Sequence, residues 1–310
     1  MKTNNLTHYA AIDIGSNAVR LLIKNVAVSE IKPLFRKVQL IRIPLRLGDD
    51  AFVYGKISEE KEKQLTHLMK AYKEIMEIYE VEEYRACGTS AMRDAANGNE
   101  VVARIEQAAG VKIDIIDGKE EARLILNNSI EQIYTGTGTY LYVDVGGGST
   151  ELNLIDDGVL KSSSSYDIGT VRMINNTVDP LLFDMFRHDL IKIHLLYPSI
   201  KVIGSGGNIN KLIRLSNAPQ KDTPMLSISH LKDIYKELRN LTTEERMNRF
   251  RLKPDRADVI IPAAEIFLEI AKYTDTRFII VPTIGLSDGI IDDIFSKNQQ
   301  PASSNNENQN

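Results

Sequence analysis

One pattern occurs twice in the chain and limits its fold more than any other feature. Residues 9–26 read YAAIDIGSNAVRLLIKNV, and residues 140–158 read YLYVDVGGGSTELNLIDDG. In each stretch an apolar strand leads into Asp-x-Gly and a turn of small polar residues, and a second apolar strand follows. Asp13 therefore matches Asp144, and Gly15 matches Gly146. Two copies this far apart in the sequence predict two lobes built on one topology.

The rest of the chain alternates strand-like and helical stretches. Apolar residues recur at spacings of three and four after Ser58, which predicts a long amphipathic helix capped by Ser58, and a later helix should end at Gly110. Alternating strands and helices predict α/β lobes with a largely parallel core sheet. We expect an N-terminal lobe over 1–125, a second lobe over 126–297 with its last helix at 286–297, and a disordered polar tail over 298–310.

Composition and charge exclude several classes of function. The 310 residues carry a net charge of −4, so the protein lacks the basic field that a nucleic-acid-binding domain usually has. Cys87 is the only cysteine, which excludes an intrachain disulfide, and its apolar strand predicts a core residue. The chain starts without an apolar leader and contains no stretch of membrane-spanning length. We therefore expect a cytoplasmic protein, without nucleic-acid or membrane partners, that would bind a polyanion through local groups.

The second copy of the repeat has the composition of a phosphate-binding loop. Three glycines at 146–148 remove side chains from a tight turn, so consecutive backbone N–H groups can form an anion-binding nest. Asp144 and Glu151 flank this turn, where two carboxylates would repel a bare phosphate but hold one that carries Mg²⁺. The alternative is a glycine-rich hairpin with solvated acids. The matching turn at 13–17 favours the phosphate loop, because two such turns from paired lobes would border one cleft.

Several further stretches occur in a fixed order with this loop. They read AAIDIGSNAVRLLI, RLGDDAF, GTSAMRDAANG, IDGKEEARL, DVGGGSTEL, DIGTVRM, IGSGGNINKL and DRADVIIPAAEIF. In order and spacing they resemble the exopolyphosphatase and guanosine pentaphosphate phosphohydrolase (Ppx/GppA) family of the actin, sugar-kinase and Hsp70 superfamily, from about Ala10 to Ile294. The resemblance implies two ribonuclease H-like (actin-like) α/β lobes related by duplication, with the active-site cleft between them. It also implies a homodimeric hydrolase that uses Mg²⁺, or alternatively Mn²⁺.

The resemblance assigns roles to individual residues. Glu121, the second acid of GKEEAR, matches the catalytic carboxylate that deprotonates the attacking water, although by itself it reads as an ordinary acid of a first helical turn. Asp144 and Glu151 match the acids that hold the cation. Arg93 matches an arginine of the cleft, with pairing to Asp94 as the alternative. The residues expected to hold phosphates are Asp13, Gly15, Ser16, Asn17, Arg93, Gly146, Gly147, Gly148, Ser149 and Thr150.

Four more arginines carry open alternatives. Arg20 occupies a position that some family members use near phosphates, and a solvent-facing strand residue is the other interpretation. Arg36, Arg42 and Arg46 are separated by even numbers of residues in an extended stretch, which predicts one strand face with all three. They would guide a polyanion, or they would simply solvate an edge strand. Closure of the lobes about a hinge near 122–140 should exclude bulk water from the reaction.

The preferred function is removal of the terminal phosphate from inorganic polyphosphate. Departures from the family pattern at Asn208, Ala263 and Ser287–Asp288 affect the choice of substrate rather than hydrolysis. The helical C-terminal domain of longer members is missing, which predicts an open cleft and a preference for short chains. The alternatives are hydrolysis of guanosine pentaphosphate, a non-catalytic sensor for polyphosphate or alarmone, and a superfamily kinase. The acids at 121, 144 and 151 argue against the sensor, because anion binding alone gains nothing from carboxylates.

Overall fold

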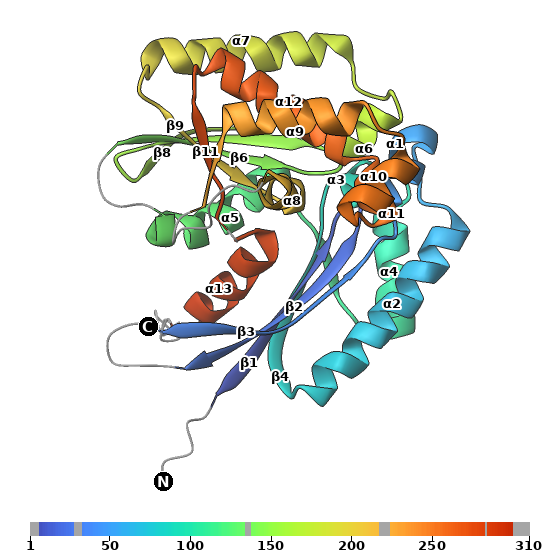
Figure 1. The fold of residues 1–310 in the computed structure, drawn as a ribbon. Coiled ribbons are helices and arrows are strands. Elements are labelled where there is room, and N and C mark those ends of the chain that lie inside the picture. The colour runs from blue at the N-terminus through green and yellow to red at the C-terminus, as the bar shows by residue number, and fades with distance from the viewer. Residues whose placement is uncertain (1–5, 28–32, 134–137, 217–223, 283, 300–310) are drawn as a thin grey trace, which may run out of the picture.

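Two β-sheets, one in each lobe, form the frame of the protein (Figure 1). The structure, a computed structural model, describes residues 6–27, 33–133, 138–216, 224–282 and 284–299, with the backbone alone for 126–133. Lobe I contains the sheet β3-β2-β1-β4-β5, with β1 at Thr7–Ile14, β2 at Val19–Ala27, β3 at Leu34–Ile43, β4 at Val81–Gly88 and β5 at Ile113–Ile115. Lobe II contains the sheet β10-β11-β9-β6-β7-β8, with β6 at Thr139–Val145, β7 at Thr150–Asp156, β8 at Val159–Tyr166, β9 at Lys201–Ser205, β10 at Met225–Ser227 and β11 at Phe278–Ile280.

The two sheets repeat one topology, as the sequence pattern predicts. Strands β8-β7-β6-β9-β11 follow the order of β3-β2-β1-β4-β5, and β10 adds an antiparallel edge strand. The turn after the first strand also repeats, since the Gly15 N–H donates to the Ala18 carbonyl at 3.2 Å and the Gly146 N–H donates to the Ser149 carbonyl at 2.9 Å. The expectation of a largely parallel sheet is wrong for the first three strands of each lobe. These strands pair antiparallel because few residues separate them along the chain, too few for the crossover connection that parallel strands need.

Helices cover both outer faces of the sheets and fill the space between them (Figure 1). They are α1 at Leu47–Tyr54, α2 at Glu59–Ile78, α3 at Ser90–Asp94, α4 at Gly98–Ala109, α5 at Gly118–Ile133, α6 at Thr170–Ile174, α7 at Pro180–Leu196, α8 at Gly207–Leu215, α9 at Ile228–Arg239, α10 at Thr243–Phe250, α11 at Pro254–Ala257, α12 at Ile260–Tyr273 and α13 at Leu286–Gln299. Helices α2 and α4 pack on lobe I from outside, and α7, α9 and α12 pack on lobe II from outside. Helices α5 and α13 form the central layer.

The alternation of side chains along the first strand of each repeat aims one aspartate at the space between the lobes. In β1, Ala10 and Ile12 belong to the outer core, whereas Tyr9 and Ala11 belong to the central layer. Asp13 continues the second set, because successive strand side chains point to opposite faces. In β6 the same alternation places Asp144 on the face of Tyr140 and Tyr142, which also belong to the central layer. The two aspartates of the repeat therefore face the same interior space.

Helix α5 follows the strands of lobe I in the sequence but packs on lobe II, and α13 follows the strands of lobe II but packs on lobe I. Helix α13, the last in the sequence, packs on β1, β2 and β4 of lobe I, while α5 packs on β7 and β8 of lobe II. Helix α13 was expected over 286–297 and continues to Gln299. The boundary at 125/126 falls inside α5, and the lobe boundaries stay a prediction. The expected tail from 300 onward, and residues 134–137 of the expected hinge, lie outside the described residues.

Several local predictions are confirmed. Ser58 caps α2, since its hydroxyl accepts from the Lys61 N–H at 3.3 Å, and Gly110 ends α4 with φ 66°. Cys87 is fully buried in the central layer, and burial raises the pKa of its thiol to about 12, which suits a core residue and not a nucleophile. Within the described ranges, no helix combines the length and the apolar character needed to cross a membrane.

The crossing of α5 and α13 predicts an unusual response to a glycine substitution. A Cβ at Gly289 of α13 would overlap the Leu124 carbonyl of α5, whereas a Cβ at Gly285 would meet no atom within 4 Å. Alanine normally stabilises a helix relative to glycine, but Gly289→Ala should lower the free energy of unfolding by about 1–3 kcal/mol through overpacking. Urea unfolding measures this difference, with Gly285→Ala as the matched control. Equal stability of the two variants would contradict the close crossing.

Candidate active site

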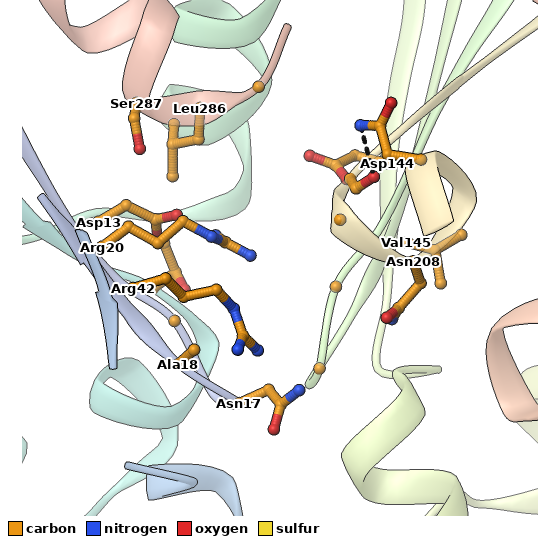
Figure 2. A pocket seen from close by; sticks show the side chains of 18 of the residues that line it. Asp13, Asn17, Ala18, Arg20, Arg42, Asp144, Val145, Asn208, Leu286 and Ser287 are labelled. Atoms are coloured by element: carbon orange, nitrogen blue, oxygen red, sulfur yellow. Dashed lines mark hydrogen bonds and ion pairs between the residues drawn. The ribbon is translucent and has the colours of Figure 1, made fainter. Parts of the chain in front are cut away.

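A cavity of about 360 Å³ lies between the lobes, where the central layer ends (Figure 2). The C-terminal ends of β1 and β6 contribute Asp13 and Asp144 to its lining, and the first turns of α5 and α13 contribute Glu121 and Leu286. Helix α8 also begins at the cavity, with Gly207 and Asn208. The N-terminal turns of three helices therefore border one space. Free N–H groups and the positive ends of helix dipoles favour anions in such a place.

The glycine loop of lobe II is anchored from behind by the start of α6. The carbonyl of Gly146 accepts from the Thr170 N–H at 3.1 Å, and the carbonyl of Gly147 accepts from the Val171 N–H at 2.7 Å. The carbonyl of Gly148 accepts from Nε of Arg172 at 2.8 Å. Because a trans peptide points its C=O and N–H to opposite sides, the N–H groups of residues 147–149 point away from α6. Three successive donors on one side of a loop form an anion-binding nest.

The matching turn of lobe I touches this loop directly. A Cβ added at Gly147 would lie 3.0 Å from Cβ of Ser16 and 3.2 Å from the Asn17 backbone nitrogen. The Asn17 side chain also donates to the Asp255 carbonyl of lobe II at 3.1 Å. The two turns that the sequence pairs by their pattern therefore lie side by side at the bottom of the cavity.

Three carboxylates form an acidic cluster on one side of the cavity. Asp144 and Glu151 are directly opposite in the β6–β7 pairing, and Glu121 reaches them from α5. Burial, then repulsion from Glu151 and Asp144, raises the pKa of Glu121 well above its usual range. Burial and repulsion from Glu151 raise the pKa of Asp144 to about 7, and burial raises that of Glu151, whose carboxylate accepts from the Ser165 hydroxyl at 3.0 Å. Arg93, 4.0 Å from the Glu121 carboxylate, offsets only part of this repulsion, so the cluster favours a further positive charge beside it.

The acidic cluster fits a hard divalent cation that shares its coordination with other ligands. Oxygen donors suit Mg²⁺, and Oε2 of Glu121 is buried without a hydrogen-bond partner. In the described part of the chain, no group of three His, Cys, Asp or Glu side chains is arranged to hold a metal ion by itself. Asp144 lines the cavity, whereas Glu151 is 2% exposed and lies behind it. A cation here would therefore take most of its ligands from phosphates and water, as Mg²⁺ commonly does.

Arg20 and Arg42 of lobe I lie on the side of the cavity opposite Asp144 (Figure 2), and Arg214 and Arg256 of lobe II also line the cavity. Arg20 pairs with Asp13, and Nη1 of Arg42 lies 2.5 Å from the Asp255 carboxylate across the lobes. Burial, then repulsion from Arg42 and Arg20, lowers the pKa of Arg256 to about 9. The cavity therefore has an acidic and a basic side, and the basic side suits a polyanion.

The prediction that Arg36, Arg42 and Arg46 share one strand face is wrong. The β2–β3 pairing shifts register between Ile23 and Lys24, so that Lys37, not Arg36, shares the face of Arg42. Lys37 lines the cavity with Arg42, whereas Arg36 does not. Arg46 lies beyond the end of β3 with φ 52° and forms an ion pair with Asp258 at 2.5 Å. A one-residue bulge cannot be read from the spacing of charges, because it changes which residues share a face.

The structure brings most of the predicted site residues to the cavity. Those that line it are Asp13, Gly15, Ser16, Asn17, Glu121, Asp144, Gly146, Gly147 and Ser149. Thr150 does not, since its hydroxyl is buried and donates to the Ile168 carbonyl at 2.5 Å. Gly148 is held between the lobes, where a Cβ would lie 2.5 Å from the Phe52 ring. Arg93 donates to the Ile116 carbonyl at 3.0 Å and lies 4.0 Å from the Glu121 carboxylate, beside the acid rather than in the lining.

Several lining residues were missed by sequence reasoning. They are Lys37, Arg214, Arg256 and Asn210. Arg256 lies in the stretch DRADVIIPAAEIF, which contributes to the family resemblance, and the motif was the available signal for it. Asn210 lies in the stretch IGSGGNINKL, so a motif was the available signal for it as well. Arg214 lies on α8 beyond this stretch, and its position at the cavity depends on lobe packing.

Two sheets of one topology, a central helix pair and an interlobe cavity define a two-lobed, actin-like α/β fold. The crystal structure of the Aquifex aeolicus Ppx/GppA family member matches this fold with a TM-score of 0.74, covering 95% of this chain and 100% of that chain at 25% identity. Exopolyphosphatase 2 of Mycobacterium tuberculosis is 27% identical over 299 residues, covering 88% of this chain and 92% of that protein. Guanosine-5'-triphosphate,3'-diphosphate pyrophosphatase of Aeromonas hydrophila is 29% identical over 168 residues, covering 54% of this chain and 33% of that protein.

Residues 22–298 match the Ppx/GppA phosphatase family, and the chain belongs to this family. The match confirms the family that the ordered motifs suggested, and with it a phosphatase. The repeated sheets confirm the predicted fold class.

The raised pKa of Asp144 predicts how the stability of the metal-free protein depends on pH. A carboxyl group with a pKa of about 7 in the folded state keeps a proton that the unfolded chain releases near pH 4. The folded state binds more protons in this window, so stability should fall as the pH rises from about 4 to about 7, by at most about 1.4 kcal/mol per pH unit for one proton. Asp144→Asn should flatten this slope, as measured by urea unfolding in EDTA at a series of pH values.

The control for this experiment is Asp233→Asn, which removes an exposed carboxylate from α9 and should keep the wild-type slope. Parallel pH profiles of Asp144→Asn and wild type would show that Asp144 does not titrate in this range.

Proposed function

We propose that the protein hydrolyses the terminal phosphoanhydride bond of inorganic polyphosphate by attack of water, as an exopolyphosphatase. The observation that carries the proposal is the position of Glu121, a carboxylate with a raised pKa at the edge of a cavity that also holds the glycine loop. Phosphoryl transfer to water requires a base of this kind, a nest of N–H donors and the positive charge that the basic side supplies. The name of the M. tuberculosis relative supports the same reaction.

Different residues of the cavity bind the substrate, accept the proton and neutralise charge in this reaction. N–H groups of residues 147–149 hold oxygens of the terminal phosphate, and the arginines of the basic side bind the following phosphates. Glu121 accepts a proton from the attacking water as the water oxygen bonds to phosphorus and the bond from phosphorus to the leaving phosphate breaks. The raised pKa makes Glu121 a stronger base than an exposed glutamate once it is ionised. Mg²⁺ or Mn²⁺ at Asp144, when bound, would neutralise phosphate charge and help align the displacement.

Guanosine pentaphosphate is the second candidate substrate. It presents a terminal phosphoanhydride to the same loop and differs from polyphosphate in the rest of the molecule, which includes a nucleobase. Leu22, Leu40 and Leu286 line the cavity near its basic side and offer an apolar surface to a nucleobase. The name of the Aeromonas hydrophila relative supports this substrate, although the match covers about half of the chain. Preference for short polyphosphate, the homodimer and the cytoplasmic location stay predictions.

Replacement of Glu121 tests the reaction. Glu121→Gln keeps the size of the side chain but removes the base, so kcat for phosphate release should fall on the order of 10²- to 10⁴-fold. Binding of tripolyphosphate, measured by calorimetry, should change little. Phosphate release is measured with Mg²⁺ on tripolyphosphate, long-chain polyphosphate and guanosine pentaphosphate.

The matched control is Glu120→Gln in the same helical turn. Glu120 pairs with Arg85 and Arg123 and does not line the cavity, so its loss should leave most of kcat. Near wild-type turnover by Glu121→Gln would remove the assignment of the base. Turnover of the nucleotide alone would move the protein to alarmone hydrolysis, and no turnover of any substrate would favour a binding protein.

The bulge in β3 provides a test of the basic side. Lys37 and Arg36 are adjacent, exposed and positively charged, but only Lys37 shares the cavity face. Lys37→Ala should raise KM for polyphosphate roughly two- to fivefold, as expected for an exposed charge pair. Arg36→Ala removes the same charge from the other face and should leave KM unchanged. Steady-state kinetics at low and high salt measures KM for both variants. Equal changes in KM would contradict the β2–β3 register, in which only Lys37 shares the cavity face.

A further inference from the structure

Arg172 of α6 connects the glycine loop to the opposite lobe. Its Nε donates to the Gly148 carbonyl at 2.8 Å within lobe II, and its side chain is 11% exposed. Its Nη2 pairs with Asp94 of α3, and the guanidinium carbon lies 3.9 Å from the centroid of the Phe52 ring of α1. Both α1 and α3 belong to lobe I and lie next to α6 (Figure 1). One guanidinium group therefore contacts the loop and two elements of the other lobe.

The bond to Gly148 fixes a peptide that the phosphate site uses. Because the C=O and N–H of a trans peptide point to opposite sides, the Arg172 contact determines where the Ser149 N–H points. Ser149 lines the cavity. Gly148 is also confined by lobe I, because any Cβ there would overlap the Ser90 hydroxyl and lie 2.5 Å from the Phe52 ring. The shape of the loop thus depends on both Arg172 and the presence of lobe I.

We propose that Arg172 is a positioning residue that couples contact between the lobes to the geometry of the phosphate-binding loop, an inference that rests on the proposed function for its catalytic consequence. When lobe I is docked, Asp94 and Phe52 hold the guanidinium so that Nε meets the Gly148 carbonyl. When the lobes separate, Arg172 loses both supports from lobe I and keeps only Asp167 of its own lobe, whose carboxylate lies 3.6 Å from Nη2, so the Ser149 N–H loses its fixed direction. The loop can therefore hold a phosphate only while the lobes are in contact.

The decisive comparison is between Arg172→Ala and Arg187→Ala. Arg187 of α7 has the same kinds of contact: Nε donates to Glu269 at 2.6 Å, Nη1 lies 3.4 Å from Asp184, and the guanidinium lies 5.5 Å from the Phe183 ring centroid. It is not a lining residue of the cavity. Arg172→Ala should lower kcat on the order of ten- to a hundredfold, the effect of a small misplacement in an active site. Arg187→Ala should keep kcat, with a comparable shift in the midpoint of thermal unfolding.

A double-mutant cycle separates positioning from simple loss of an ion pair. Asp94→Asn leaves the loop untouched but weakens the hold on Arg172, so it should lower kcat in the wild-type background and have little further effect in Arg172→Ala. Methylguanidine should restore part of kcat to Arg172→Ala and none to wild type. Unchanged kcat in Arg172→Ala, or fully additive effects of the two substitutions, would overturn the proposal.

A measurement without substrate keeps this inference distinct from the proposed function. The Gly146 N–H closes the loop by donating to the Ser149 carbonyl, and the N–H groups of Thr170 and Val171 join α6 to the loop by donating to the Gly146 and Gly147 carbonyls. Their hydrogen exchange in the ligand-free protein should be faster in Arg172→Ala and Asp94→Asn than in wild type, and unchanged in Arg187→Ala. If wild type releases no phosphate, the proposed function fails while faster exchange still supports the coupling. Unchanged exchange in both variants would overturn the coupling, whatever the activity.

Discussion

The packing of α5 against α13 determines where the cavity between the lobes lies. Leu124 and Ile125 of α5 and Ile290 and Ile291 of α13 are buried in one apolar cluster that also includes side chains from both sheets. The two helices fill the space between the sheets, and their N-terminal turns lie beside Asp13 and Asp144, so that the space beyond them forms the cavity. Because each helix begins there, its free N–H groups add positive potential to the site. The contact that joins the lobes therefore also creates the anion-binding end.

The cavity keeps apart charges that would neutralise one another if they met. Glu121, Asp144 and Glu151 repel each other on one side, and Arg42 and Arg256 do so on the other. Oε2 of Glu121 and Nε of Arg42 are buried without hydrogen-bond partners. Such atoms are unfavourable in the free protein. A phosphate chain with a divalent cation would satisfy both sides at once, because the cation faces the acids and the phosphates face the arginines. Binding energy of this origin is specific for a polyanion that carries a metal.

The sequence predicts the features that depend on local pattern. The repeat at 9–26 and 140–158 identified the two turns and their aspartates, and the capping signals at Ser58 and Gly110 identified helix ends. The features that it missed depend on contacts between distant segments. The bulge that places Lys37 in the cavity follows from the pairing of two strands, and the exchange of α5 and α13 follows from burial of apolar faces on both sheets.

The same distinction applies to the candidate site. The motif around 144–151 predicted a phosphate loop, but the support of that loop comes from α6 and from lobe I, whose approach no local pattern encodes. Thr150 shows the limit of motif reasoning, since a hydroxyl next to the loop was expected to bind phosphate. Strand alternation instead aims its side chain at the Ile168 carbonyl.

Comparison of the two repeats shows how a symmetric fold acquires an asymmetric site. Asp13 is directly opposite Arg20 in the β1–β2 pairing, and Asp144 is directly opposite Glu151 in the β6–β7 pairing. The register is the same, but the partner charge is reversed. An arginine beside the first aspartate neutralises it, so that the turn of lobe I carries no net negative charge to repel a phosphate, whereas a glutamate beside the second concentrates negative charge where a cation would be held. One exchange of charge at equivalent positions thus makes one turn compatible with an anion and the other compatible with a cation.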